Sequence, residues 1–149
     1  MAVTKKIIGW GKCEAKITPS GENPSPTTHN DIAEGTTSLS VEEGDEQEAL
    51  IEGGEAEARK HNPDKYIIEY ERRIGSASEV EPGFTEDAGS VQIIPEQSGA
   101  IGVTLTGVSC YISLSFDTTD GLKAHYTYKT KGTTDANGKL TDVSLQAKA

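Results

Sequence analysis

The chain has 149 residues, of which 24 are acidic and 14 are lysine or arginine, so its net charge is −10. This acidic balance argues against a protein that grips nucleic acid, because such binding depends on cations that neutralise phosphates. No stretch approaches the roughly 20 consecutive apolar residues that a membrane helix needs, and the N-terminus lacks the apolar run of a secretory signal. We therefore expect cytoplasmic synthesis and no membrane partner.

Length and composition predict one β domain over residues 1–149. Only 34% of the residues are hydrophobic, whereas threonine, serine, glycine and valine are plentiful. β-Branched residues suit a pleated surface, and scattered glycines disfavour helix interiors. The core must therefore be small and built mainly from strands.

The first predicted strand spans Lys6 to Ile17. Its alternate residues form a small, largely apolar face that we expect to point inward: Ile7, Gly9, Gly11, Cys13, Ala15 and Ile17. Thr18 to Asp31 contains three prolines and no periodicity, so it is predicted to be a connecting loop.

An acidic run follows between Glu42 and Glu57, with eight acidic residues and no lysine or arginine. Ser38 to Asp45 and Ala49 to Gly54 have the alternation and glycine punctuation typical of the two arms of a hairpin. We expect an ordered, charged hairpin or loop projecting over about residues 36–64. The alternative is a solvated acidic loop that only aids solubility.

The next segment, Lys65 to Ile74, has the clearest strand pattern in the chain. Aromatic and aliphatic side chains dominate one face, and charges of both signs occupy the other. Ser76 to Ala88 is the one stretch with helical character, a turn or two before Pro82-Gly83 ends it. A short strand is then predicted for Ser90 to Ile94, ending at Pro95.

The C-terminal third is predicted to contain the longest strand, Ala100 to Phe116. Its apolar residues change face near Gly107-Val108, which indicates a bulge or bend. A turn at Thr118 to Gly121 predicts that Lys123 to Thr130 pairs back on it, and Val143 to Ala147 is a last short strand. The predicted fold is mainly β: an antiparallel β-sandwich or half-barrel of about seven strands with at most one short helix.

No catalytic, cofactor or metal site emerges from the residue patterns. The three histidines are far apart, and no His-x-x-x-His or Cys-x-x-Cys spacing occurs. The acidic run lacks the ligand spacing of a calcium loop. Cys13 and Cys110 are expected to be reduced core residues rather than a disulfide. We expect a protein that is not an enzyme and uses no cofactor.

Five segments together resemble phage tail tube (major tail) proteins, in particular the prophage type found in gut Bacteroidetes. The resemblance lies in a block of small residues, Glu-Glu-Gly-Asp, an acidic-apolar strand and Gly-Gly-Glu, followed by a strongly alternating strand. The segments are Ile7–Lys12, Thr37–Glu55, Lys65–Glu71, Val91–Glu96 and Asp120–Tyr128.

This resemblance implies a β-sandwich or half-barrel flanked by a short helix, assembling into hexameric rings that stack into a hollow tube. Its partners would be further copies of itself and other tail proteins, with double-stranded DNA only as passing cargo. The protein would be synthesised in the bacterial cytoplasm and end in the virion. In relatives a long hairpin reaches neighbouring subunits, and here it would map onto Ser38 to Asn62. The helix pattern around Ser76 to Ala88 departs from the family because it is weak.

We expect the subunit interface to involve this hairpin and the two chain ends. The candidate interface residues are Leu39, Val41, Glu43, Asp45, Glu48, Leu50, Ile51 and Glu55. Two alternatives stay open: the tube protein of a secretion or contractile injection system, and a small β-sandwich module that binds a carbohydrate or protein ligand.

Overall fold

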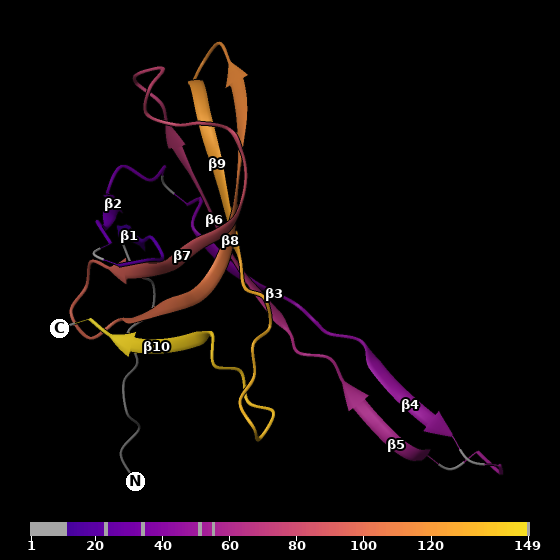
Figure 1. Ribbon diagram of the computed structural model, residues 1–149. Helices are drawn as coiled ribbons and strands as arrows, with labels where there is room; N and C mark the ends of the chain where they lie inside the picture. The colour runs from indigo at the N-terminus through magenta and orange to yellow at the C-terminus, as the bar shows by residue number, and fades with distance from the viewer. Residues whose placement is uncertain (1–11, 23, 34, 51, 55, 149) are drawn as a thin grey trace, which may run out of the picture.

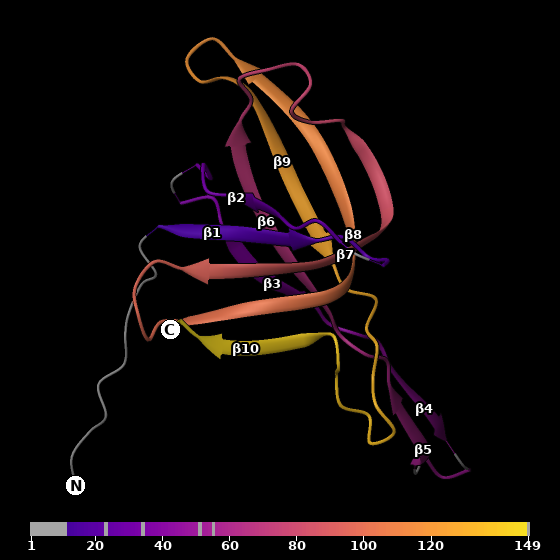
Figure 2. The ribbon, with the colours of Figure 1, turned by 60° about the vertical axis from the view of Figure 1, so that its left-hand side comes forward.

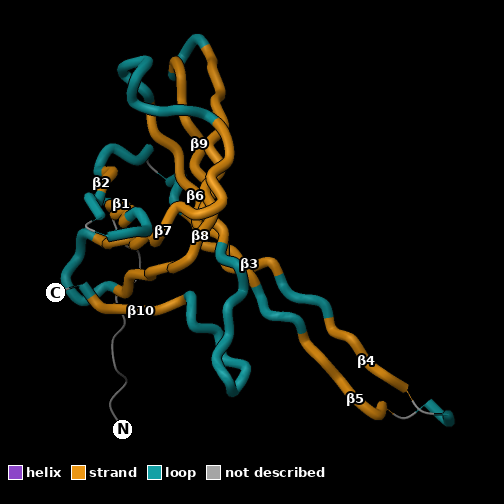
Figure 3. The backbone as a smooth tube through the Cα atoms, viewed as in Figure 1, coloured by secondary structure: helices purple, strands orange, loops and turns teal. Residues whose placement is uncertain are grey.

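The structure is a computed structural model that describes residues 12–22, 24–33, 35–50, 52–54 and 56–148, with the backbone alone for residues 56–60. The part of the predicted first strand before residue 12 lies outside these ranges. The described chain folds into ten strands and no helix, all with antiparallel pairing (Figures 1 and 3). The strands are β1 Cys13–Thr18, β2 Thr27–His29, β3 Ser38–Glu42, β4 Glu46–Leu50, β5 Ala56–His61, β6 Lys65–Arg73, β7 Gly83–Pro95, β8 Ile101–Asp117, β9 Gly121–Lys129 and β10 Val143–Ala147.

Eight strands form one strongly curved sheet in the order β2-β1-β7-β8-β9-β6-β3, with β10 paired to β8. The sheet curls over itself, so that β1 and the first part of β8 lie across β6 and β9 (Figure 2). Past β2 the chain reaches the edge of β6, where Ile32 bridges Arg72 and the Ala33 amide donates to the Glu71 carbonyl at 2.8 Å. The sheet does not close, so the fold is a half-barrel, and the predicted mainly antiparallel β class is confirmed.

The core lies on the concave side of this sheet. It contains the inward-facing residues of the alternating strands, as their patterns predict. The largest fully buried side chains are Tyr70, Ile68, Ile93, Leu105, Val91, Val103 and Val108. In β1, Ala15 is fully buried and both Cys13 and Ile17 pack against the core, so the predicted inward face is confirmed for these three residues. Both cysteines are reduced, and Cys110 is buried.

The bend predicted at Gly107 is present, and it lets β8 serve both halves of the sheet. In the pairing of β7 with β8, Gly89 lies opposite Val108 and Ser90 opposite Thr106, which leaves Gly107 as an extra residue. Its φ of 62° is a left-handed conformation that glycine adopts without strain. The extra residue explains why the buried positions change parity, from Leu105 to Val108, while the same face of the sheet stays inward.

Four local predictions were wrong. No helix forms in 76–88: the Glu79 amide donates to the Ser76 carbonyl at 3.1 Å in a turn, and β7 begins at Gly83, well before the strand predicted from Ser90. The predicted loop Thr18–Asp31 contains β2. The chain segments β3 and β4 do not pair with each other, because β3 pairs with β6 and β4 pairs with β5.

Candidate assembly surface

The strands β4 and β5 form a separate two-stranded sheet that projects far from the half-barrel (Figure 1). We call residues 46–61 the arm. The arm continues the pairing of β3 with β6: Glu42 lies opposite Lys65 and Glu46 lies opposite His61, so both strands advance by the same number of residues. One long ribbon therefore runs from the body to the tip, and the projecting element predicted over about residues 36–64 corresponds to this ribbon and not to a hairpin of β3 with β4.

The ribbon is interrupted where the arm leaves the body, at residues 43–45 and 62–64, which we call the joint. Here the Asn62 amide donates to the Asp45 carbonyl at 2.8 Å. The backbones approach so closely that a Cβ on Gly44 would lie 1.9 Å from the Asn62 carbonyl oxygen. Glycine is required at this position because any side chain would force the two strands apart.

A single carboxylate connects both strands of the joint. Asp64 Oδ1 accepts from the Gly44 amide at 2.9 Å and lies 3.2 Å from His61 Nε2. The Gly44 N–H and, to a smaller extent, His61 hold the pKa of this carboxyl below its ordinary value. The Asn62-Pro-Asp64 sequence indicated a turn, but the role of Asp64 depends on pairing that the sequence does not show.

The candidate interface residues fall into two separate groups. Leu39 and Val41 lie on the edge strand β3, opposite Ile68 and Tyr66, so they continue the core face outward; they are 42% and 50% exposed. Glu48 and Leu50 lie on β4, with Leu50 60% exposed, and Glu43 and Asp45 lie in the joint. Ile51 and Glu55 lie outside the described residues.

At the body end of the ribbon, one acidic residue of this region is paired with a lysine of the body. Glu42, the last residue of β3, forms an ion pair with Lys129 of β9. That contact lowers the pKa of the Glu42 carboxyl through a hydrogen bond and the positive charge of Lys129. Beyond it, Glu43, Glu46 and Glu52 are exposed to solvent.

A second exposed apolar group was not assigned to an interface from the sequence. Phe84 of β7 and Tyr111 of β8 lie opposite each other and are 64% and 52% exposed, and Phe116 near the end of β8 is 72% exposed. Phe84 was missed because its segment was predicted to be helical. Phe84 itself was the signal in the sequence, because a bulky aromatic residue at this place is consistent with a β7 that begins earlier than predicted.

Inside the half-barrel polar side chains connect three strands, β2, β6 and β9, and Asp31 just after β2. His29 Nδ1 lies 2.7 Å from the Tyr70 hydroxyl, which lies 3.1 Å from the Tyr128 hydroxyl. Arg72 binds both carboxylate oxygens of Asp31 at 2.8 and 3.0 Å and donates to the Tyr126 hydroxyl at 3.0 Å.

This environment shifts the pKa values of its members. Burial, and then the charge of Arg72, lower the pKa of His29 to about 4 against an opposing effect of Asp31. Burial raises the pKa of Tyr70 and of Tyr128. The hydrogen bond between His29 and Tyr70 connects β2 to β6 across the half-barrel.

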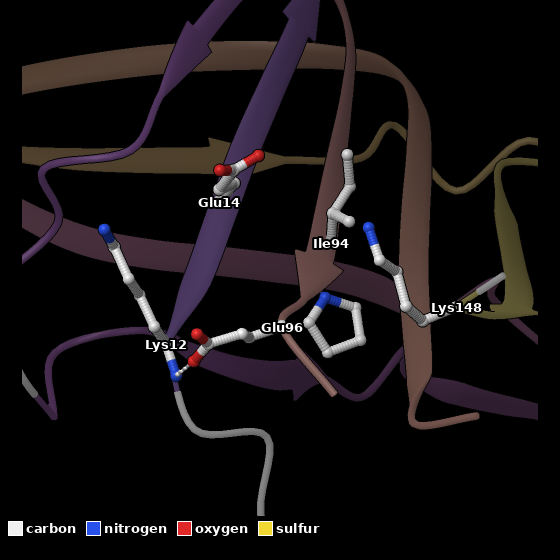
Figure 4. Close-up of a pocket in the computed structure, with 6 residues that line it drawn as sticks. Lys12, Glu14, Ile94, Glu96 and Lys148 are labelled. Atoms are coloured by element: carbon white, nitrogen blue, oxygen red, sulfur yellow. Dashed lines mark hydrogen bonds between the residues drawn. The ribbon is translucent and has the colours of Figure 1, made fainter. Parts of the chain in front are cut away.

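A small cavity lies at the other end of the molecule, beside the last residues of β7. Its volume is about 210 Å³, and Lys12, Glu14, Glu96 and Lys148 surround it with Ile94 and Pro95 (Figure 4). Within it the Lys12 amide donates to the Glu96 carboxylate at 3.3 Å. Pockets for small ligands are larger and mostly apolar, at about 300–1,000 Å³. This cavity therefore does not favour a ligand-binding module.

Two further observations concern the described residues alone. In them no group of three or more histidine, cysteine, aspartate or glutamate side chains is placed to hold a metal ion. In the same residues, no helix of the length and apolarity required to span a bilayer is found.

Searches against protein-family models and curated protein sequences returned no match to this chain.

Proposed function

We propose that this protein is a structural subunit of a phage tail tube, which assembles with copies of itself into stacked rings. The observation that carries the proposal is the arm, a ribbon that leaves the half-barrel and exposes backbone edges and the apolar side chain of Leu50 away from any core. An isolated two-stranded sheet is marginally stable in water at best. A partner that covers the arm would supply the missing contacts.

The body offers a complementary reason for self-association. Leu39 and Val41 extend the core face along the edge strand β3, where apolar side chains remain accessible. Exposed edge strands with apolar residues are sites at which another chain can add. A subunit that completes its core with a neighbour would need these features.

The charge fits a conduit for DNA. With a net charge of −10, subunits arranged around a lumen would repel phosphates and let double-stranded DNA pass without binding. The resemblance of the acidic block and the following strand to tail tube proteins points the same way. Under this proposal other tail proteins are further partners, the virion is the destination and the protein catalyses no reaction.

Assembly of the purified protein tests the proposal. Negative-stain electron microscopy at high protein concentration should show rings or tubes. The critical variant replaces residues 46–61 by Asn-Gly, a dipeptide suited to a two-residue hairpin turn, so that Asp45 and Asn62 stay paired at the base. This variant should remain folded and monomeric, because it lacks the arm while it keeps the joint.

A matched control removes acidic charge elsewhere on the surface. Glu79→Gln with Glu81→Gln reduces the charge near the turn after β6, on the body rather than on the arm. This variant should assemble like the unmodified protein. Monomers at every concentration of the unmodified protein, or tubes formed by the armless variant, would refute the proposed function.

A further inference from the structure

The loop between β9 and β10 lies beside the base of the arm in two views (Figures 1 and 2). We call residues 131–142 the buttress loop. A Cβ on Gly132 would lie 3.2 Å from the Pro63 Cβ and 3.5 Å from the Asp64 carbonyl oxygen, so the loop backbone packs directly on the joint. The direction in which the arm leaves the body therefore depends on where this loop is held.

The buttress loop is held by one buried carboxylate. Asp142 is only 4% exposed, and its Oδ2 accepts from the Gly132 amide at 3.0 Å and from the Thr133 amide at 2.9 Å. Its own carbonyl accepts from the Thr106 amide of β8 at 2.9 Å, which ties it to the sheet. Buried carboxylates are costly unless they are hydrogen-bonded, and these two amide bonds satisfy Oδ2, whereas Oδ1 is buried with no hydrogen-bond partner among the described residues.

The rest of the loop is folded on itself. Thr134 bridges Leu140, the Thr141 amide donates to the Thr133 carbonyl at 3.0 Å, and Asp135 Oδ1 accepts from the Asn137 and Lys139 amides at its tip. The loop thus behaves as a short hairpin whose first residues are fixed by Asp142. A displacement of Asp142 would move the part that contacts Pro63.

We propose that Asp142 is a positioning residue that fixes the direction of the arm before any partner binds. The contacts run in series from Asp142 to Gly132, from Gly132 to Pro63 and Asp64, and from the Asp64 carboxylate to Gly44 and His61 on the two strands of the joint. These contacts fix the direction of the arm within a single chain, before any association. A preset element loses less conformational entropy on association than one that must first be ordered. The proposal concerns the monomer and does not depend on the proposed assembly.

Distance measurement between two spin labels on the monomer tests this inference. The labels are placed through Lys16→Cys on β1 and Gln47→Cys on β4, both exposed positions, in a Cys13→Ser, Cys110→Ser background. The unmodified joint should give a single narrow distance peak. Asp142→Ala should cause loss of that peak and a broad distribution, and Asp142→Asn, which keeps a carbonyl oxygen, should restore part of it.

Two further variants keep the test decisive if Asp142→Ala fails to fold. Asp64→Ala removes the carboxylate that connects the joint strands, and Gly44→Ala prevents their close approach, so each should also abolish the narrow peak. Asp117→Ala is the matched control, because Asp117 likewise accepts two amide bonds, from Thr119 and Asp120, in the turn between β8 and β9. A broad distribution in the unmodified chain would overturn the inference, as would a narrow one in a folded Asp142→Ala variant or in Asp64→Ala and Gly44→Ala.

Discussion

The half-barrel body and the arm are two parts of one ribbon with opposite relations to solvent. In the body, β6 is covered on its inner face, and Ile68 and Tyr70 are fully buried. In the arm, β4 has the same pairing geometry, yet every one of its residues is exposed. Strand pairing alone therefore does not decide whether a strand of this molecule is buried. The difference between the two regions is the presence or absence of a second layer.

The largest effect is expected from a pair of truncations, one on each side of this comparison. Ile68→Ala creates a cavity in the fully buried core and should lower the free energy of unfolding by about 2–5 kcal/mol. Leu50→Ala, on the exposed arm, should change it by less than about 0.5 kcal/mol. Urea denaturation followed by circular dichroism measures both values. Equal losses in the two variants would show that the isolated arm has a covered core of its own.

A smaller difference separates two adjacent arginines of β6. Arg72→Gln breaks the paired hydrogen bonds to Asp31 and the bond to Tyr126, and should lower the free energy of unfolding by about 1–3 kcal/mol. Arg73→Gln is the control: this side chain is 63% exposed and bonds Asp120 at 3.0 Å, so about 0–1 kcal/mol is expected. Thermal unfolding of the two variants measures the loss in the free energy of unfolding for each. A greater loss for Arg73→Gln would mean that the contacts of Arg72 with Asp31 and Tyr126 do not stabilise the half-barrel.

The smallest effect concerns pH. The pKa of His29 is lowered from its ordinary value of 6.5 to about 4, so the folded chain binds fewer protons than the unfolded chain between these values. Stability should therefore fall as the pH decreases from about 6.5 to about 4. His29→Gln should reduce this slope, because it removes the titrating ring and keeps a polar side chain near Tyr70. Urea midpoints at several pH values measure it, and an identical slope in both proteins would contradict the assigned pKa.

Much of the body could be predicted because its strands carry the alternation that a one-sided core demands. Lys65–Ile74 and the long strand through Gly107 both show it, and even the bulge follows from the change of face between Leu105 and Val108. The turn at Thr118–Gly121 was equally visible, and β9 begins at Gly121 as its pairing requires. Local pattern and tertiary structure agree in these segments.

The remaining features could not be predicted because they depend on distant partners. The start of β7 is exposed and, apart from Phe84, has no large apolar side chain, so it forms a strand through pairing with β8 rather than through burial. In the same way the partner of β4 was misassigned, since Ala56–His61 has no apolar alternation of its own. Asp64 and Asp142 resemble ordinary turn residues in the sequence. Their roles follow from Gly44 and Gly132, which the fold alone brings near them.

The unbroken register across the joint has a consequence for how this molecule can vary. β3 matches β6 residue for residue, and β4 matches β5 in the same way from Glu46 to Ala49, with a register shift only between Ala49 and Leu50. Residues can therefore be added to or removed from both arm strands in equal number between the joint and this shift without changing the body. Changes of two residues per strand would also keep every side chain on its present face. Each residue adds roughly 3.3 Å of reach. The arm is thus a modular extension whose length can be adjusted independently of the domain that carries it.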